Sequence, residues 1–451
     1  MTAAEAARAA LAAADCEAEA VAHAERSGLV RFAGSEVHQP TLIDNLEVTL
    51  RVVDDRCVGV ATTNRVDADG LAAVAARARA AAANAPVDPD FPGLAEPAPV
   101  PEVEGLDERT AGLGPDDQAR LASEAIAAAD LPVYGFFTSA VSELAVASST
   151  GVDVSQRVTD AVALVVAADE TGSGYAEATA WQADEIDPGA VAREAAEKAN
   201  RTRNAEAVEP GSYAAVLEPY ALAELLQYFA FDSLGGLGLL EERSYLSGRI
   251  GTTVFDEQIT LSDDPLNPNG LPRAFDFEGV PKRRVELVSS GVARGVVWDR
   301  ATANRSRNGV QTTGHAPPAG EGELGPMATA LSLTGGDAES TDELAERIGD
   351  GLYITRLHYL GVVDPREGVV TGTTRDGTFL VRDGKIAGPL VNLRFTVSVP
   401  EVLRDVHGLT RDVSLVNASQ FYGPRYVYGA RVPALATSRF HITGIGGAPG
   451  I

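Results

Sequence analysis

The sequence predicts an α+β protein with two domains. An N-terminal mixed α/β domain is expected over residues 1–210, and a β-rich C-terminal domain over residues 211–451. Three observations lead to this prediction. Apolar residues alternate at positions 46, 48, 50 and 52, as in a half-buried strand. Alanine-rich helical segments alternate with strands in the first half, which indicates helices packed on a largely antiparallel sheet. From about residue 250 onward, strand-and-turn segments dominate.

The N-terminal domain is expected to begin with a helix. Thr2 and Glu5 have the spacing of a capping box, and an alanine-rich stretch follows them. A second helix is predicted over residues 67–85, where Pro86 ends the pattern. Residues 86–110 form a proline-rich connector that is too polar for the core and should be semi-extended.

The rest of this domain should hold two more helices and several strands. Residues 115–130 begin with a proline and acidic residues, as the first turns of helices do. Strand segments follow between about 132 and 182, and a polar helix is expected over about 188–203. Pro210 and Gly211 then mark the predicted domain boundary.

The C-terminal domain opens with a short buried strand and a helix over residues 221–236. The apolar residues of this helix recur at helical spacing, and a pair of glycines ends the pattern. One further helix is expected over residues 340–350. The dipeptides Asp376-Gly377 and Asp383-Gly384 are flanked by alternating apolar residues, which predicts two hairpin turns.

Composition and charge exclude several classes of function. The net charge is −27, from 64 acidic and 37 basic residues, and a field of this sign repels nucleic acids and anionic membranes. No apolar run is long enough to span a membrane, and the N-terminus lacks the pattern of a secretion signal. The two cysteines, Cys16 and Cys57, support neither a disulfide framework nor a thiolate metal site. These features favour a cytoplasmic protein.

The sequence lacks the local motifs of common catalytic and cofactor sites. None of the six histidines has another four or five residues later, and neither G-x-S-x-G nor a P-loop occurs. The polar face of the helix over residues 221–236 presents no histidine. Its side chains are those of Glu224, Gln227, Tyr228 and Asp232.

One loop is a candidate for lining a binding cleft, although an exposed loop serving turn geometry explains it equally well. It spans residues 311–320, and its candidate cleft residues are Thr312, Thr313, Gly314 and His315. The acidic pairs at 54–55 and 263–264 are interpreted as turns on a solvated surface.

Several segments together resemble the TldD/PmbA family of zinc-metalloprotease-related proteins, specifically its PmbA (TldE) branch. The stretch FDFEGVPKRRVELVSSGV (275–292) resembles a family segment before a charged strand, and TTGHA (312–316) is similar to a Thr-Gly-His-Ala loop of that branch. Residues 349–395 match the closing signature of the family. The resemblance covers most of the chain and supports the α+β assignment.

The resemblance also interprets the helix over residues 221–236. In the catalytic branch, this helix carries H-E-x-x-x-H, in which two histidines bind zinc and the glutamate is the base. Here Gln227 stands at the first ligand position, Tyr228 at the base position and Asp232 at the second ligand position. A neutral amide is a poor zinc ligand, and a phenol with a reference pKa of about 10 cannot replace a carboxylate base. The additional cysteine ligand of the family is missing too, because no cysteine follows Cys57.

The resemblance therefore implies a subunit without catalytic residues or metal of its own. A TldD-type catalytic subunit would be its partner and would hold the zinc, and extended peptides would be the substrates, with no nucleic acid or membrane involved. The two together would form a cytoplasmic heteromeric protease that degrades or matures small or unfolded peptides, and this chain would help to enclose the peptide cavity. Two alternatives stay open: an autonomous hydrolase that pairs His315 with Asp232 or Glu224, and a peptide-binding or regulatory module without a protease partner.

Overall fold

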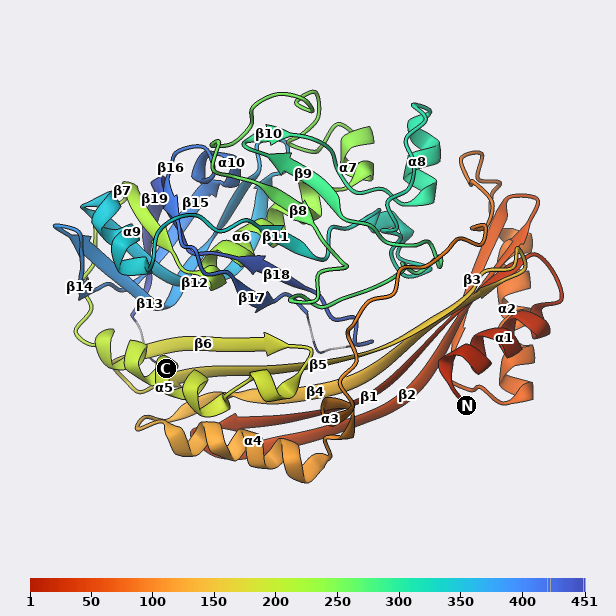
Figure 1. Ribbon diagram of the computed structural model, residues 1–451, viewed down its shortest axis with the longest axis horizontal. Coiled ribbons are helices and arrows are strands. Elements are labelled where there is room, and N and C mark those ends of the chain that lie inside the picture. Colours follow the sequence, from red (N-terminus) through yellow and green to blue (C-terminus); the bar gives the residue numbers. More distant parts are fainter. Residues whose placement is uncertain (420, 422, 449, 451) are drawn as a thin grey trace.

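A long curved antiparallel sheet forms the base of the molecule, and the C-terminal half of the chain lies on its concave face (Figure 1). The computed structural model describes residues 1–419, 421, 423–448 and 450. The six strands of the base follow the order β3-β2-β1-β4-β5-β6, and every neighbouring pair is antiparallel. They are β1 (Ala18–Ala33), β2 (Glu36–Asp54), β3 (Cys57–Thr63), β4 (Val133–Ser148), β5 (Asp153–Ala168) and β6 (Ser173–Ala180).

Helices cover the outer face of this base sheet in two groups (Figure 1). One group packs small alanine side chains onto β1, β2 and β4, and the other packs onto β1, β4, β5 and β6. The first group is α1 (Ala3–Ala14) and α2 (Ala68–Asn84); the second is α4 (Pro115–Ala128) and α5 (Pro188–Arg201), with the short α3 (Glu108–Gly112) and the 3₁₀ turn η1 (Ala183–Glu185) nearby. The predicted capping box is confirmed, because the Thr2 side chain accepts from Glu5 N and the Glu5 side chain accepts from Thr2 N.

The proline-rich connector contains no named helix or strand between α2 and α3. It contacts both halves of the chain. Arg300 Nη1 donates to Gly93 O at 2.7 Å, and Thr159 N donates to Gly105 O at 2.8 Å.

Two further sheets build the C-terminal half. Their strand orders are β10-β9-β8-β11-β18-β17 and β12-β7-β19-β15-β13-β14, and β16 pairs with β19. The strands are β7 (Gly211–Leu217), β8 (Leu261–Asp263), β9 (Val285–Ser289), β10 (Val292–Ala293), β11 (Leu331–Leu333), β12 (Gly351–Asp364), β13 (Val369–Arg382), β14 (Lys385–Pro389), β15 (Asn392–Ser398), β16 (Val406–Leu409), β17 (Ser414–Asn417), β18 (Gly429–Val432) and β19 (Leu435–Gly447). The helices are α6 (Pro219–Ser233), α7 (Gly236–Leu240), α8 (Arg300–Ser306), α9 (Thr341–Ile348) and α10 (Val399–Val402), with the 3₁₀ turn η2 (Gly322–Leu324).

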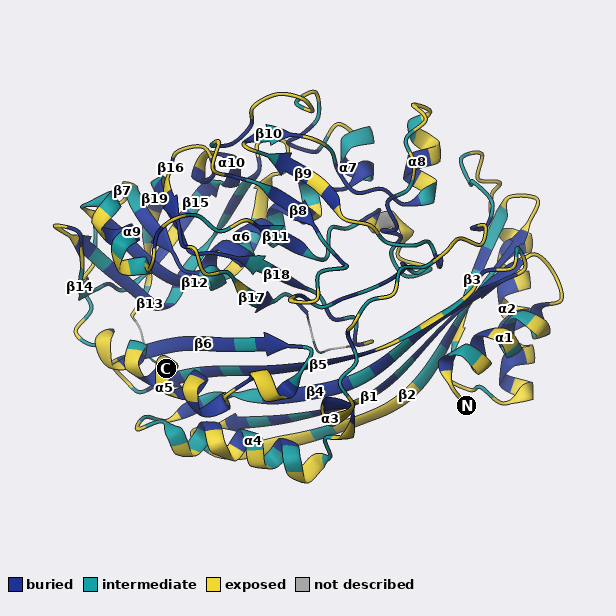
Figure 2. Cartoon of the chain, viewed as in Figure 1, coloured by how far each residue is buried: buried dark blue, intermediate teal, exposed yellow. Residues whose placement is uncertain are grey.

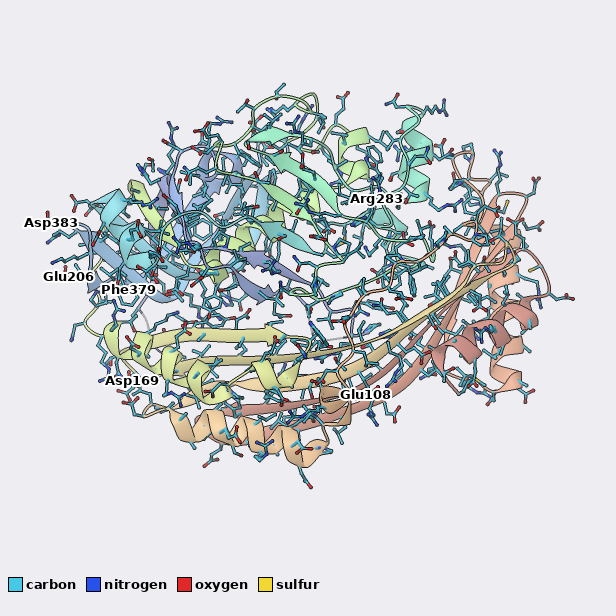
Figure 3. All side chains as sticks on the ribbon, in the orientation of Figure 1. Glu108, Asp169, Glu206, Arg283, Phe379 and Asp383 are labelled. Atoms are coloured by element: carbon cyan, nitrogen blue, oxygen red, sulfur yellow. The ribbon has the colours of Figure 1, made fainter. Side chains whose placement is uncertain are left out.

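Only one of the two predicted hairpin turns is a turn. Asp383 and Gly384 join β13 to β14 with φ of 50° and 74°, and Asp383 lies at the outer edge of the molecule (Figure 3). The prediction for Asp376-Gly377 is wrong, because this pair lies inside β13. The two residues have positive φ, 54° and 133°, and lie at a shift in the register between β13 and β12. Both of them stand opposite Thr355 of β12. The result is a β-bulge, and the two residues adopt positive φ here as residues of a tight hairpin turn do.

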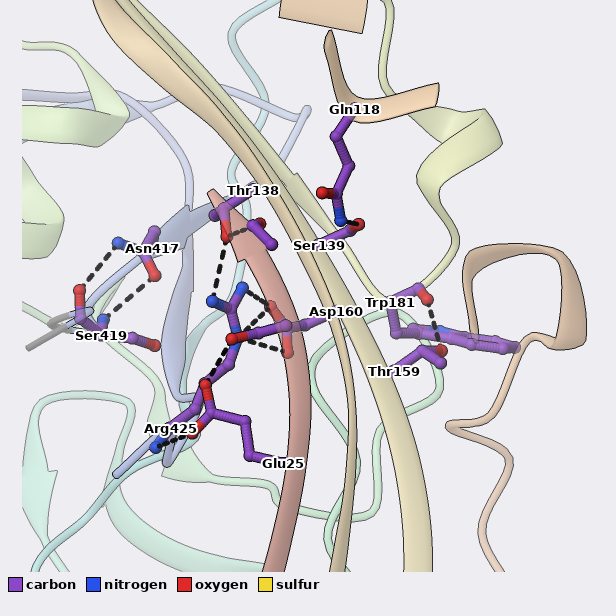
Figure 4. A network of polar contacts seen from close by, with 12 residues as sticks. Glu25, Gln118, Thr138, Ser139, Thr159, Asp160, Trp181, Asn417, Ser419 and Arg425 are labelled. Carbon is purple, nitrogen blue, oxygen red and sulfur yellow. Dashed lines mark hydrogen bonds and ion pairs between the residues drawn. The ribbon is translucent and has the colours of Figure 1, made fainter. Parts of the chain in front are cut away.

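A buried arginine joins the base sheet to the C-terminal half (Figure 4). Arg425, 4% exposed, lies on the concave side of the sheet, and its Nε is 3.1 Å from both carboxylate oxygens of Asp160 in β5. Its Nη1 donates to Thr138 Oγ1 at 3.0 Å, and its main-chain N donates to Glu25 Oε2 at 3.1 Å. Paired and hydrogen-bonded on several sides, this buried charge fixes the loop before β18 against the sheet.

The α+β assignment is confirmed. Buried residues follow the strands of all three sheets, and exposed residues gather on the outer sides of helices and on the first half of β2 (Figure 2). In the described part of the chain, no helix has both the length and the apolarity needed to cross a bilayer.

Candidate functional site

Helix α6 is held by its apolar face, which leaves its other face free for chemistry. The helix follows β7 directly, with Pro219 in its first turn. Leu222, Leu225, Leu226 and Phe229 are at most 2% exposed and belong to the main core of the C-terminal half. Burial of each such side chain is worth about 1.5–3 kcal/mol, so this face determines the rotation of the helix about its axis.

The opposite face of α6 carries partly exposed polar side chains. Glu224, Gln227, Tyr228 and Asp232 are all of intermediate exposure, and Phe231 among them is 48% exposed. Burial raises the pKa of Glu224 to about 7, although Arg356 opposes the shift. Burial also raises the pKa of Asp232, whose Oδ1 lies 3.9 Å from Arg243 Nη1.

Residues from distant segments surround the N-terminal half of this polar face. Arg356 of β12 lies over the ring of Tyr175 in β6, 4.2 Å from its centroid, and its Nη2 is 3.1 Å from Asp376 Oδ2. The Tyr175 hydroxyl donates to Glu177 Oε2 at 2.7 Å. Burial raises the pKa of the Glu177 carboxyl and, more strongly, that of the Tyr175 hydroxyl. Glu224 therefore adjoins a cluster that links the base sheet to the C-terminal half.

The start of α6 is fixed by a buried ion pair. Glu218 precedes the helix, and its Oε2 lies 2.7 Å from Lys198 Nζ of α5, while its Oε1 accepts from Thr355 Oγ1 at 2.8 Å. Sequence reasoning missed these residues and the cluster around Arg356. They come from separate segments, and no local pattern connects them.

The residues at the expected zinc positions do not fit a zinc ion. Gln227 offers a neutral amide, Tyr228 a phenol whose pKa burial raises further, and Asp232 a single carboxylate. Zinc sites use histidine, cysteine and carboxylate ligands, three or four at a time. Among the described residues, no group of three or more histidine, cysteine, aspartate or glutamate side chains is placed to hold a metal ion.

The loop over residues 312–316 is largely buried. Thr313, Gly314 and His315 are buried, and Thr312 is of intermediate exposure. Thr313 Oγ1 accepts from Trp298 N at 2.7 Å, and Thr312 Oγ1 lies 3.1 Å from Trp298 O. These bonds fold the loop onto the body of the domain. That it lines a substrate cleft stays a prediction.

His315 pairs with a carboxylate that the sequence analysis placed on the surface. Its Nε2 is 2.9 Å from Asp263 Oδ1, and its Nδ1 is 2.9 Å from Thr313 Oγ1. Asp263 is fully buried in β8, so its interpretation as a solvated turn residue is wrong. Ala330 N donates to Asp263 Oδ2 at 2.8 Å. Together with the imidazole, this hydrogen bond makes burial of the carboxylate possible. Both ring nitrogens of His315 are thus engaged, which leaves neither for Asp232 or Glu224.

Comparison with protein families finds matches along most of the chain. Residues 18–82 match the PmbA/TldA metallopeptidase domain 1, residues 108–203 the central domain, and residues 210–444 the C-terminal domain.

Solved structures with the same fold come from several organisms. TldE from Thermococcus kodakarensis superimposes with a TM-score of 0.85 at 21% identity, covering 97% of this chain and 99% of that one. A putative modulator of DNA gyrase from Thermotoga maritima gives a TM-score of 0.81 at 20% identity, covering 95% and 96%. At these identities the similarity shows the fold alone.

Curated relatives match over shorter regions. A protein named metalloprotease from Methanothermobacter thermautotrophicus is 30% identical over 230 residues, which is 50% of this chain and 48% of that protein. Another of that name from Archaeoglobus fulgidus is 29% identical over 206 residues, 45% of this chain and 46% of that protein. The chain thus spans about half the length of these relatives. With all three family domains present in order, and the third alone covering over half of its length, the chain belongs to the PmbA/TldD family of metallopeptidases.

Proposed function

We propose that this chain is the non-catalytic subunit of a heteromeric zinc metallopeptidase and that a TldD-type partner holds the zinc. In this proposal the complex works in the cytoplasm on small or unfolded peptides, and this chain helps to enclose the peptide and align it. The zinc, when bound in the partner, would supply the activated water for hydrolysis.

The polar face of α6 carries the proposal. The apolar face of the helix is packed in the core, and the family resemblance assigns Gln227, Tyr228 and Asp232 to the positions at which the catalytic branch has zinc ligands and base. Their donor set suits hydrogen bonding to a peptide better than metal binding, because an amide and a phenol both donate and accept. Main-chain hydrogen bonds to an extended peptide give affinity without dependence on its sequence. Alignment of this kind can lower the barrier of a reaction without contributing a ligand.

The comparisons support the family part of this proposal. The name TldE of the structural neighbour and the name metalloprotease of the curated relatives are consistent with it.

Reconstitution tests the proposal. The purified chain, a TldD-type protein from the same source, and their mixture should each be assayed for zinc content and for cleavage of an unstructured peptide. We expect zinc in the partner and full cleavage only in the mixture. Stoichiometric zinc with chelator-sensitive cleavage by this chain alone would support the autonomous hydrolase. Peptide binding without any association with the partner would support the independent binding module.

A further inference from the structure

One edge of the base sheet is left open along the first half of β2. The neighbouring strand β3 pairs with β2 only from Val48 to Asp54, and among the described residues no other strand continues this pairing toward Glu36. Residues 36–45 are exposed except for Thr41, so this part of the strand is uncovered on both faces of the sheet (Figure 2). An edge of this kind presents a row of unpaired main-chain N–H and C=O groups, which can pair with another strand.

The register of the sheet identifies the main-chain groups that point outward. Val53 N donates to Glu17 O at 2.9 Å, and the pairing of β1 with β2 continues from there without a shift as far as Gln39. Main-chain groups of successive residues point to opposite edges of a strand, so the odd-numbered residues of β2 bond to β1 and the even-numbered ones face the open edge. The main-chain groups of Leu42 and Asp44 therefore point outward, and they make no hydrogen bond at this edge within the described structure.

Sheet edges in natural proteins are usually protected against pairing, and only the first part of this edge is. A bulge at His38 interrupts the register with β1, and Pro40 has no N–H to offer at its outward position. Residues 41–47 contain no lysine, the residue most used to protect an edge. They expose two apolar side chains instead, Leu42 at 64% and Ile43 at 36%, one on each face of the sheet. This stretch can accept an added strand of about seven residues.

Charge favours a basic strand over a second copy of the chain as the occupant of this edge. The charged residues of the stretch are Asp44 and Glu47, on opposite faces of the sheet. The exposed Asp44 side chain makes no ion pair in the described structure; its register partner Arg26 donates instead to Ala111 O. A second copy would bring the same carboxylates and a further net charge of −27 to the edge, which opposes self-pairing. A basic strand would be attracted by the same field.

A pocket of about 280 Å³ borders the edge on the outer face of the sheet. Leu42, Asp44 and Leu113 are among the residues that line it. Lysine and arginine side chains combine an apolar stem with a charged end, so either suits a wall in which leucines adjoin a carboxylate. Every second side chain of an added strand would point to this face.

We propose that the open edge of β2, residues 41–47, binds an extended basic peptide by strand addition. Main-chain hydrogen bonds to the outward-facing groups supply affinity, and basic side chains next to Asp44 and Glu47 supply the preference. The site belongs to the base sheet and not to the polar face of α6. Binding there requires neither a TldD-type partner nor hydrolysis, so it does not depend on the proposed role in proteolysis.

Fluorescence anisotropy with the full chain tests this proposal. The probe is a labelled heptapeptide, acetylated and amidated, in which lysine and valine alternate. We expect it to bind, more weakly as salt rises, and a version with glutamate in place of lysine to bind at least about tenfold more weakly. N-methylation of alternate residues leaves one edge of the peptide free and should preserve binding, whereas N-methylation of every residue blocks both edges at unchanged charge and should abolish it. No binding at millimolar concentrations, or equal binding of the fully methylated peptide, would overturn the proposal.

Two substitutions at one position then locate the site. Leu42→Pro removes an outward-facing N–H but, as at Pro40, no bond to β1. It should weaken the lysine–valine peptide about fivefold more than Leu42→Ala, which removes the side chain alone. Equal binding by the two variants would contradict strand addition at this edge. If Leu42→Pro does not fold, the methylated peptides on the unsubstituted chain still decide.

Two further outcomes would assign the edge or the peptide differently. Loss of binding in Tyr228→Ala, with none in Leu42→Pro, would place the peptide on α6 and overturn the proposal. Sedimentation velocity without peptide should show no dimer that depends on this edge. A dimer that Leu42→Pro dissociates would show that a second copy of the chain occupies the edge, and would overturn the proposal as well.

Discussion

Glu19→Gln should remove a pH-dependent loss of stability from this protein. Glu19 of β1 is 1% exposed, and no hydrogen bond reaches either of its carboxyl oxygens in the described structure. Arg51 Nη1 lies 3.3 Å away and is shared with Glu278, at 3.0 Å. Burial is the main cause that raises the pKa of Glu19 to about 7, and the neighbouring carboxyls of Glu278 and Asp276 add to it, while Arg51 opposes.

The sign of the effect follows from proton binding. A carboxyl whose pKa is raised in the folded state holds its proton there at a pH where the unfolded chain has released it. Its penalty on folding is therefore absent below the unfolded pKa of about 4.5 and grows until the pH passes 7. With the folded pKa near 7, the penalty stays below about 1 kcal/mol at pH 5 and reaches about 3 kcal/mol at pH 8. Glu19 thus removes roughly 2–3 kcal/mol of stability between pH 5 and pH 8.

Urea denaturation at both pH values measures this difference. The Glu19→Gln variant cannot ionise at this position, so it should lose roughly 2–3 kcal/mol less than the original chain between pH 5 and pH 8. Arg51 keeps Glu278 as a partner in the variant. Glu17→Gln, at an exposed position two residues earlier, is the control and should follow the original chain. Parallel curves for Glu19→Gln and the original chain would refute the raised pKa, and a variant less stable at pH 8 would show that the ion pair with Arg51 outweighs burial.

Three more predictions follow from other contacts. Arg425→Met leaves the buried Asp160 carboxylate without its cation and should cost about 3–5 kcal/mol in denaturation, and a loss below about 1 kcal/mol would contradict a role in holding the halves together. Gly314→Ala should destabilise the protein more than Gly309→Ala. Both glycines have positive φ (75° and 72°), but only at Gly314 would the new Cβ meet a neighbour, Pro281 O at 2.5 Å. Equal melting temperatures of the two variants would show that this contact relaxes freely. Gln227→Ala should leave peptide cleavage by the reconstituted complex within about tenfold, and a loss beyond a hundredfold, about 2.7 kcal/mol, in a folded complex would show a direct catalytic role.

Local signals predicted local structure well, and their limit is visible in two identical dipeptides. Both Asp376-Gly377 and Asp383-Gly384 adopt positive φ, as the sequence predicts. Only the second reverses the chain, because β14 follows and pairs back onto β13. The pair Asp376-Gly377 does not reverse the chain, because β13 pairs with β12 both before and after the bulge. A dipeptide specifies the backbone conformation, and the partner strand decides between bulge and turn.

Charged residues were harder to place, because their burial depends on partners that are distant in the sequence. Asp263 precedes another aspartate and has the pattern of a surface turn, yet it is buried against His315, 52 residues later. Likewise, Tyr175, Glu177 and Arg356 meet only when β6 and β12 come together. No periodicity within one segment carries this information. The positions of Gln227 and Tyr228, by contrast, follow from one helix and its apolar spacing.

The two faces of α6 differ in what a substitution there would cost. Its apolar face is nearly inaccessible to water and packs in the main core, so that substitutions there cost several kcal/mol. The opposite face is partly exposed, and changes at such positions usually cost little. The residues that specify the fold and those that specify the chemistry are thus separable within one helix. This chain and TldE superimpose over nearly their full lengths at 21% identity, and such a similarity in fold is compatible with either an active or an inactive helix. Only the side chains on the polar face of the helix can distinguish the two.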